Sequence, residues 1–450
     1  MQQQNPDQKF IQMTQTPVEK LIIRLAIPSI VSMLVTTVYN AADTFFIGQI
    51  STSASAAVGV CFSMMSIIQA LGFFFGQGAG SSISRALGDQ HSEQAEELAS
   101  VGFFSSVLFG TLVGVLGLMY IEPLVYLLGA TETIYPHAVE YLSIILIGAP
   151  IMGASFVLNN LLRFQGYSFY GMIGVTVGGV LNVVLDPLFI FGFGMDTAGA
   201  ALATVLSQAI SLMLLYALNN RYCSVKLRLK KFRLRRNHCA DIIRSGLPSL
   251  LRQGIASVAA ICLNLAAKPY GDPAIAAMSI VSKITMFTNS AMLGFGQGFQ
   301  PVCGFNYGAK LYDRVKQGFF FCVKGSFLFL TVLAVAEFFF AGNLIGIFRN
   351  DPEVIRIGGL ALRLQCMTLP SFSMIVISNM MLQTSGKVVS ASLVGSARQG
   401  IFLIPMVFLL PTLFGLLGIQ MAQPIADLAT LIMTIPFSVN FLQGMEQNKI

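Results

Sequence analysis

Apolar runs of about 20 residues recur along the whole chain and are separated by short polar breaks. A helix of this length crosses the ~30 Å hydrocarbon core of a lipid bilayer. Only 10% of the residues are charged, whereas soluble domains carry roughly 25%. A transmembrane β-barrel would show shorter alternating segments, and the sequence has none. The sequence therefore predicts an all-α polytopic membrane protein.

Twelve transmembrane helices are predicted, six on each side of a basic stretch at 221–241. Their approximate ranges are 22–47, 55–80, 96–120, 137–161, 169–193, 198–219, 242–266, 275–300, 317–342, 355–382, 391–411 and 416–440. We expect a cytoplasmic N-terminal tail at 1–20, an N-lobe at 21–220, a basic cytoplasmic linker at 221–241, a C-lobe at 242–441 and a cytoplasmic C-terminal tail at 442–450.

The two halves of the chain are copies of each other, related by one shift of 220 residues. Matching positions include Pro28 and Pro248, Phe75–Gly78 and Phe295–Gly298, and Gly166 and Gly386. Because each copy holds an even number of spans, both copies enter the membrane from the same side. We therefore predict parallel repeats that form two six-helix lobes with a cleft between them.

The basic residues gather on one predicted side of the membrane. Eight of them, and no acid, stand between residues 221 and 236: Arg221, Lys226, Arg228, Lys230, Lys231, Arg233, Arg235 and Arg236. Positively charged loops usually remain in the cytoplasm, close to anionic lipids. The sequence therefore predicts two cytoplasmic termini, no removable signal peptide, and contact with membrane lipids rather than with nucleic acid.

The sequence carries no motif of a soluble enzyme. It has no Walker A sequence, no H-E-x-x-H and only three histidines. Its seven cysteines include no C-x-x-C pair, which favours free thiols over a metal site or a disulfide framework. The repeated Gly-Gln-Gly at 76–78 and 296–298 is interpreted as close helix packing. We expect no enzymatic activity, no catalytic residue and no cofactor.

Two carboxylates, Asp43 and Asp186, lie inside predicted spans of the N-lobe. A carboxylate in the hydrocarbon region is costly, so it usually faces a cavity or a partner. Asn182 and Asp186 are four residues apart and share a helix face, while Tyr39 precedes Asp43 by about one turn. Burial and a neighbouring like charge both favour the protonated carboxyl group. Such a cluster can take up a proton, or bind Na⁺ at Asp43, Asn182 and Asp186.

Asn159 and Thr204 add polar groups in neighbouring spans of the same lobe. Asn159 recurs as Asn379 in the second half, which also fits a role in helix packing. Both functions stay open for Asn159.

Structural roles are also open for the two aspartates. Asp186 precedes Pro187 near a helix end, where it can satisfy free backbone groups, and Asp43 lies close to the end of its span. The positions that match Asp43 and Asp186 in the second copy hold Leu263 and Met406. A packing requirement would tend to recur in both copies, so this asymmetry favours a functional role.

Two segments resemble the multidrug and toxic compound extrusion (MATE) transporters. They are Tyr39-Asn40-Ala-Ala-Asp43-Thr-Phe-Phe-Ile-Gly48 and Gly296-Gln-Gly-Phe-Gln-Pro301-Val-Cys-Gly304-Phe-Asn306-Tyr307-Gly308-Ala309. Within the family the chain is similar to the DinF branch, which includes MepA-like bacterial multidrug efflux pumps, because its polar residues match that branch's N-lobe network. The NorM branch is expected to carry acidic ligands in the C-lobe, and the predicted spans 242–266 and 355–382 contain none.

The resemblance implies xenobiotic transport and drug resistance, with antiport of lipophilic, often cationic compounds against H⁺, or less readily Na⁺, by alternating access. The cation-coupling residues it implies are Asp43, Asp186, Asn182, Asn159, Thr204 and Tyr39. The implied substrate-binding residues are Asp43, Asp186, Thr37, Phe156, Asn159 and Gln208. Pro28 is the implied hinge. We expect a monomer in the bacterial plasma membrane, with small drug-like molecules as its partners.

Other classes of membrane protein stay as alternatives. A lipid or oligosaccharide flippase of the same superfamily would be expected to show a cationic cavity, whereas the first lobe offers acids and no base at mid-span. A channel or receptor is disfavoured by the two-lobe repeat around a one-sided acidic pair.

Overall fold

The structure is a computed structural model that describes residues 6–447. The outermost residues of the two predicted tails, 1–5 and 448–450, lie outside the described residues. Of the predicted N-terminal tail, residues 6–15 form a helix of their own and 18–20 begin the next helix; of the C-terminal tail, 442–447 continue the last helix of the chain.

The described chain is built from helices and contains no strand. The first half consists of α1 (Pro6–Gln15), α2 (Val18–Gly48), α3 (Thr52–Gly88), α4 (Ser92–Met119), α5 (Ile121–Leu127), α6 (Tyr135–Phe164), α7 (Ser168–Pro187), the π-helical turn η1 (Leu188–Gly192), α8 (Asp196–Tyr222) and the short η2 (Leu229–Lys231). The second half consists of α9 (Arg236–Ala267), η3 (Lys268–Tyr270), α10 (Asp272–Gly308), α11 (Tyr312–Phe339), α12 (Ala341–Phe348), α13 (Pro352–Thr368), η4 (Leu369–Ser371), α14 (Phe372–Thr384), α15 (Val388–Ser396), η5 (Ala397–Leu403), α16 (Ile404–Phe414) and α17 (Leu416–Gln447).

Each of the twelve predicted spans contains a helix, and the predicted all-α membrane fold is confirmed. By length and composition, 11 helices of the described chain are suited to cross a membrane. The remaining predicted span is α10, which is long but less apolar. Its polar residues Ser282, Thr285 and Asn289 line a pocket instead of facing lipid.

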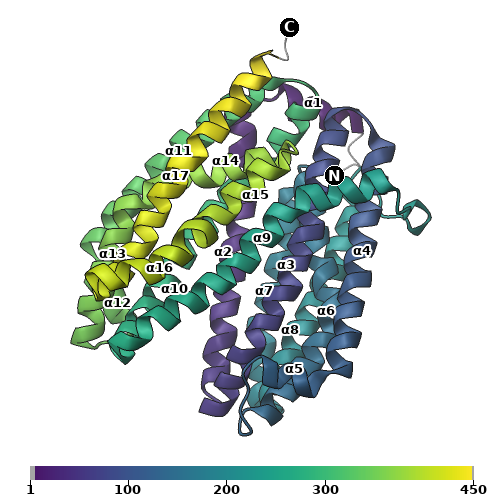
Figure 1. Cartoon of the computed structure of the whole chain (residues 1–450). Coiled ribbons are helices and arrows are strands. Elements are labelled where there is room, and N and C mark those ends of the chain that lie inside the picture. Colours follow the sequence, from purple (N-terminus) through teal and green to yellow (C-terminus); the bar gives the residue numbers. More distant parts are fainter. Residues whose placement is uncertain (1–5, 448–450) are drawn as a thin grey trace.

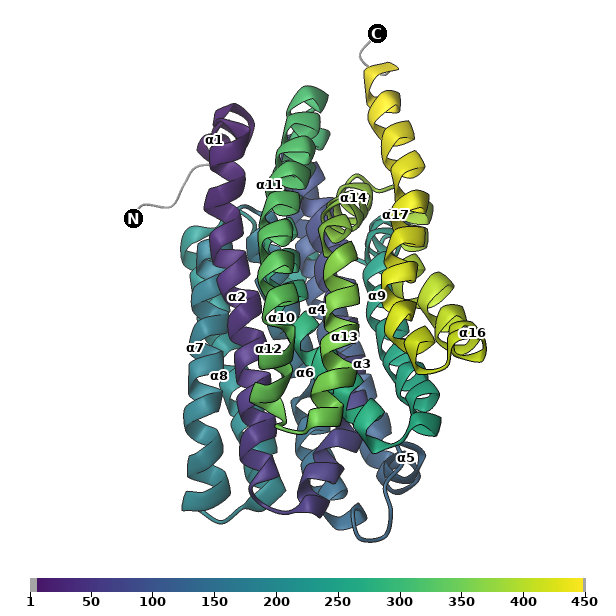
Figure 2. The same ribbon diagram turned by 90° about the vertical axis from the view of Figure 1, so that its left-hand side faces the viewer.

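The helices form two bundles, α2–α8 and α9–α17 (Figure 1). The bundles lie close together at the end of the molecule that carries both chain termini, and they diverge toward the opposite end. In the view of Figure 2, α11 and α13 lie toward the viewer on the outside of the second bundle, with α17 beside them. One cluster of buried apolar side chains is shared by both bundles, whereas two smaller clusters belong to one bundle each.

Close helix crossings hold the two bundles together near the termini, and we call this region the closure. A Cβ atom added to Gly78 of α3 would lie 2.3 Å from the carbonyl oxygen of Ile242 in α9. The matching glycine of the second copy, Gly298 of α10, would bring a Cβ atom to 2.4 Å from the Cα atom of Ala26 in α2. Only glycine allows backbones to approach this closely. The packing interpretation of the two Gly-Gln-Gly segments agrees with these contacts.

A second glycine pair continues the same closure. A Cβ atom on Gly88 would lie 2.2 Å from the Phe305 carbonyl oxygen, and one on Gly308 would lie 2.1 Å from the Arg85 carbonyl oxygen. Gly88 and Gly308 are matched positions of the repeat, and so are Arg85 and Phe305. Each copy therefore uses the same residue to contact the other, as expected of two halves related by a pseudo-twofold axis.

The linker after α8 is shorter than predicted, because Arg221 belongs to α8 and α9 begins at Arg236. Part of its positive charge is neutralised by the start of α4. The Lys231 ammonium lies 2.7 Å from a carboxylate oxygen of Glu96, and the Arg235 guanidinium lies 3.6 Å from one of Glu97.

The helix α1 contacts both bundles near the closure. The Lys9 ammonium donates to the Gly166 carbonyl at 2.7 Å and lies 4.2 Å from the centre of the Tyr167 ring. On the other side, Asn306 of α10 donates to the Met13 carbonyl at 3.2 Å. Lys9 is buried, so its charge is held in a poorly solvated place outside the predicted spans.

Replacing Lys9 with methionine should flatten the dependence of stability on pH. Burial lowers the pKa of Lys9 from 10.5 to about 7, so the folded chain binds fewer protons than the unfolded chain between these values. The stability of the wild type should then rise with pH across this window, by at most ~1.4 kcal/mol per pH unit. Thermal unfolding of the purified protein at several pH values measures this rise. Lys20→Met, at an exposed lysine, is the control and should keep the wild-type profile. Equal profiles for wild type and Lys9→Met would contradict the prediction.

Candidate functional site

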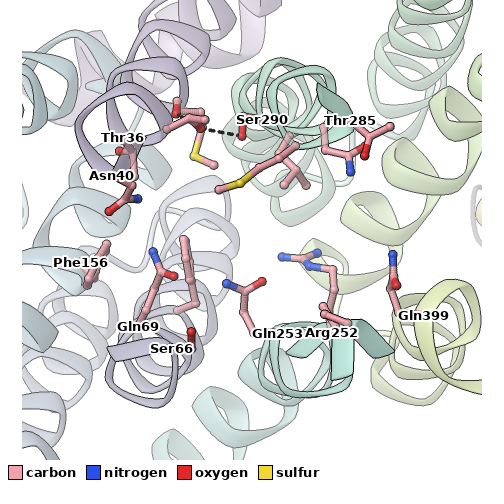
Figure 3. A pocket seen from close by; sticks show the side chains of 18 of the residues that line it. Thr36, Asn40, Ser66, Gln69, Phe156, Arg252, Gln253, Thr285, Ser290 and Gln399 are labelled. Atoms are coloured by element: carbon pink, nitrogen blue, oxygen red, sulfur yellow. Dashed lines mark hydrogen bonds between the residues drawn. The ribbon is translucent and has the colours of Figure 1, made fainter. Parts of the chain in front are cut away.

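A pocket of about 560 Å³ lies between the two bundles, a volume suited to a drug-sized molecule. One wall is formed by α2, α3, α6, α7 and α8, and the other by α9, α10, α13, α14, α15, η5 and α17. Figure 3 shows polar side chains from both walls around this space, among them Asn40 and Gln69 from the first bundle and Gln253 and Gln399 from the second. The glycine crossings described above close the pocket toward the termini.

Asp43 of α2 lines this pocket, as the sequence predicts for a carboxylate inside a span. Its Oδ1 atom is buried and has no hydrogen-bond partner among residues 6–447. Tyr39, one turn earlier on α2, interacts with Asp43 and with Gln208 of α8, and both of these residues also line the pocket. The pocket therefore contains a carboxylate with an unused acceptor.

Asp186 lies behind the pocket wall, at the end of α7. It is fully buried and does not line the pocket. Asn182 donates through Nδ2 to Asp186 Oδ1 at 3.2 Å and to Thr204 Oγ1 at 3.3 Å. Asp186 Oδ2 has no partner within the described chain, and the residue is close enough to Asp43 to interact electrostatically. In this conformation a molecule in the pocket would contact Asn182 and Thr204 rather than Asp186.

The structure thus brings together the predicted cluster of Asp43, Asn182, Asp186 and Thr204, and it gives the two carboxylates different surroundings. The pocket borders Asp43 directly, whereas Asp186 is reached through the amide of Asn182. Two buried acceptor atoms without partners, one on each carboxylate, are the sites at which a proton or a small cation can bind. Oxygen ligands of this kind suit H⁺ or Na⁺ equally, so the geometry does not choose between them.

Asn159 lines the pocket and also links α6 to α7 through a hydrogen bond. Its Nδ2 atom donates to the Gly171 carbonyl of α7 at 3.1 Å. The matching residue Asn379 donates to the Ala391 carbonyl at 2.7 Å, and Gly171 and Ala391 are themselves matched positions. The same bond in both copies is the packing role that the recurrence of Asn159 suggests.

The other predicted substrate residues also line the pocket. Thr37 of α2 donates to Ser290 of α10 at 2.9 Å, so it links the two walls (Figure 3). Phe156 of α6 lies in the first wall, with its ring centre 5.8 Å from that of Phe73. Thr37 therefore has a bond to lose when the bundles separate.

The predicted hinge, Pro28, is a buried residue of α2, and the helix continues past it without a break. Proline supplies no amide hydrogen to the preceding turn, so α2 lacks one hydrogen bond there. A Cβ atom on Gly294 of α10 would lie 2.5 Å from Ile30 Cα, so the position borders the closure between the bundles. A hinge role remains a prediction.

Three arginines also line the pocket. Arg163, which follows the predicted span 137–161, belongs to α6, is 3% exposed and lines the pocket. This base of the first lobe stands in the last turn of its helix and not at mid-span, and it still reaches the pocket. Arg252 and Arg398 line the second wall. Arg252 stands inside the predicted span 242–266, and a charge inside an apolar run is the same signal that identified Asp43.

The second bundle holds two buried carboxylates that do not line the pocket. Asp427 accepts from Arg398 Nε at 2.8 Å and from Gln423 Nε2 at 2.7 Å. Glu337 accepts from Thr288 Oγ1 at 2.8 Å. Both carboxylates accept hydrogen bonds from protein groups. Because neither lines the pocket, Asp43 is the acidic side chain that borders it in the described chain.

Comparison with known proteins identifies the family of the chain. The family model MatE matches residues 28–188 and 248–409, which together make up most of the sequence. The chain belongs to the MatE family. The two matches begin 220 residues apart, which is the register of the internal repeat.

Relatives of this MatE chain are named as transporters, not as enzymes. Multidrug export protein MepA of Staphylococcus aureus is 26% identical over 425 residues, which cover 94% of this chain and 93% of that protein. A multidrug resistance MATE family transporter of the MOP superfamily, solved in an outward-facing conformation, has a TM-score of 0.92 at 26% identity and covers 97% of this chain and 98% of its own. A MOP superfamily transporter from Pyrococcus furiosus has a TM-score of 0.91 at 26% identity, and the match covers 97% of this chain and 98% of that one. The reverse polarity of its binding pocket is described as suggesting a different function.

Proposed function

We propose that this chain exports lipophilic, often cationic drug-like molecules by antiport against a cation, H⁺ in preference to Na⁺. The observation that carries the proposal is the pocket of about 560 Å³ bordered by Asp43, a carboxylate with an unused acceptor. A multidrug export protein among the relatives supports the same substrate class. Both walls of the pocket come from one chain, which is why we expect a monomer to be sufficient.

The proposed mechanism is competition between the cation and the drug for the first bundle. With the pocket open away from the termini, a cation reaches Asp43 and, through Asn182, Asp186. Neutralising these carboxylates weakens the attraction for a cationic drug, which leaves. The bundles then rock, the side near the termini opens, the cation departs, and the next drug binds. If the termini are cytoplasmic, as loop charges predict, the structure represents the outward-open stage.

Transport by purified protein in liposomes tests this proposal. Export of a fluorescent cationic dye is measured under an imposed pH gradient and, separately, under an imposed Na⁺ gradient. We expect the pH gradient to drive export, and an ionophore that exchanges H⁺ for K⁺ to abolish it. Export driven only by Na⁺ would leave antiport in place and reassign the ion. A dye that moves under neither gradient would refute cation-coupled drug export.

A lipid or oligosaccharide flippase is the second candidate function, because Arg163 and Arg252 line the pocket and give it basic groups that the sequence interpretation did not expect. Movement of a fluorescent phospholipid between leaflets, measured in the same liposomes by chemical quenching of the outer leaflet, separates the two functions. We expect the rate to equal that of protein-free liposomes.

A further inference from the structure

Arg163 and Arg252 bring two positive charges to the interface between the bundles. Arg163 belongs to α6 of the first bundle and Arg252 to α9 of the second, and both line the pocket. The two residues are close enough for their charges to repel each other. In Figure 3 the guanidinium group of Arg252 points from α9 into the space between the walls.

Neither arginine has a carboxylate partner within the described chain. Arg163 Nη2 donates to Asn160 Oδ1 at 2.6 Å, and Arg252 Nη1 donates to Asn379 Oδ1 at 3.1 Å. These acceptors are neutral amides. The Nε atom of Arg163 is buried and has no partner among residues 6–447, although the side chain is 3% exposed. A guanidinium group offers five N–H donors, so most of the donors of the pair remain unused.

Arg398, the third arginine of the pocket, differs from these two because it has a carboxylate partner. Its Nε and Nη2 atoms donate to the two carboxylate oxygens of Asp427, at 2.8 and 3.4 Å. A buried charge is normally compensated in this way, because leaving it unpaired in a poorly solvated place is costly. The missing counter-charge at Arg163 and Arg252 therefore points to a ligand that brings it.

A second charged group of the pocket bears on what this ligand can be. Asp43 lies in the first wall with an unused acceptor, so the pocket contains an acid as well as a basic pair. A molecule that satisfies both carries a cationic group and an oxyanion on an apolar body. Planar guanidinium groups bind oxyanions through two parallel hydrogen bonds.

We propose that Arg163 and Arg252 form an oxyanion subsite, at which the pocket binds the carboxylate of zwitterionic amphiphiles. This inference rests on the proposed function, since it assumes that the pocket is the place where substrates bind. It adds a substrate class that the carboxylates of the first bundle do not predict, namely molecules whose negative charge is held by the arginine pair while Asp43 faces their positive charge.

A matched pair of dyes tests the subsite directly. Tetramethylrhodamine methyl ester is a cation, and its free acid is the corresponding zwitterion. Fluorescence anisotropy with the purified protein gives the affinity for each dye. We expect the wild type to prefer the acid, and Arg252→Gln to lower affinity for the acid by at least tenfold while affinity for the ester is kept or raised, because a positive charge has been removed from the pocket. Retained ester binding also shows that the variant is folded.

Two further variants make the test specific. Lys283→Gln removes a positive charge from an exposed position of α10 outside the pocket wall, and it should leave the preference for the acid intact. Arg252→Lys keeps the charge but not the planar fork, so it should lose part of the preference; it also replaces Arg252→Gln if that variant does not fold. If Arg252→Gln and Lys283→Gln changed the preference for the acid over the ester equally, the proposed subsite would be refuted.

A second measurement does not depend on dye binding. Benzoate, compared with chloride at equal concentration, should raise the thermal midpoint of the wild type and leave that of Arg252→Gln unchanged. No difference between the two proteins would count against the subsite. If the ester binds and is exported but the acid is not preferred, the subsite fails and the proposed function stands. If neither dye binds, the proposed function fails and the benzoate measurement decides the subsite alone.

A zwitterionic lipid headgroup carries the same chemistry as a zwitterionic drug. Competition by lysophosphatidylcholine separates these sources. Displacement of the free acid from the wild type would extend the subsite to phosphodiesters, and an absence of displacement would restrict it to carboxylates.

Discussion

Asp43→Asn is expected to abolish gradient-driven export and to weaken the binding of a cationic dye by about tenfold, or ~1.4 kcal/mol. Asparagine keeps the shape of the side chain but cannot take up a proton or attract a cation. Because Asp43 borders the pocket and keeps an unused acceptor, its charge acts directly on a bound cation. Asp186→Asn should also abolish export, but it should weaken dye binding less, since Asp186 has no surface in the pocket.

Export and binding are measured separately, in liposomes and in detergent, so that a coupling defect is distinguished from a binding defect. Glu337→Gln is the matched control, because Glu337 is a buried carboxylate of the second bundle that does not line the pocket. It should retain export. If Glu337→Gln abolished export while Asp43→Asn retained it, the coupling site would have to be moved to the second bundle.

The fold could be predicted from the sequence because a bilayer allows few solutions. An apolar run of about 20 residues can satisfy its backbone groups only as a helix, and the 220-residue shift then relates two groups of six. The span that differs most from its prediction is α10. Its residues Thr285 and Asn289 face the pocket, and hydropathy alone does not separate a polar face toward water from a polar face toward a partner.

Residue spacing predicts the part of the candidate site whose residues share one helix face. Asn182 and Asp186 are four residues apart, and the structure places them in hydrogen-bond contact. The depth of each residue could not be predicted: both aspartates look alike in the sequence, yet Asp43 borders the pocket and Asp186 lies behind it. Arg163 was misplaced for a related reason, since it stands within two residues of a helix end, where a sequence does not reveal whether the last turn is buried.

Gly78→Ala is expected to destabilise the closure between the bundles by ~1–3 kcal/mol, the range for overpacking a well-packed contact. The added Cβ atom would lie 2.3 Å from the Ile242 carbonyl oxygen, so two backbones have to move apart. The clash exists only while this side is closed, and the variant should therefore favour opening toward the termini. Gly298→Ala, its match in the second copy, would meet Ala26 Cα at 2.4 Å and should behave in the same way.

Gly59→Ala is the matched control for Gly78→Ala, because Gly59 lies in the same helix α3 and a Cβ atom there would have no neighbour within 4 Å. Alanine favours a helix by up to about 1 kcal/mol over glycine, so this control should be neutral or slightly stabilising. Gln300, which is fully buried and donates to Gln77 across the closure at 3.3 Å, provides a reporter position. In a Gln300→Cys background whose seven native cysteines are replaced by serine, a water-soluble maleimide should label position 300 faster with Gly78→Ala than with Gly59→Ala. Equal labelling and equal thermal midpoints would mean that the glycine crossings do not hold the bundles closed.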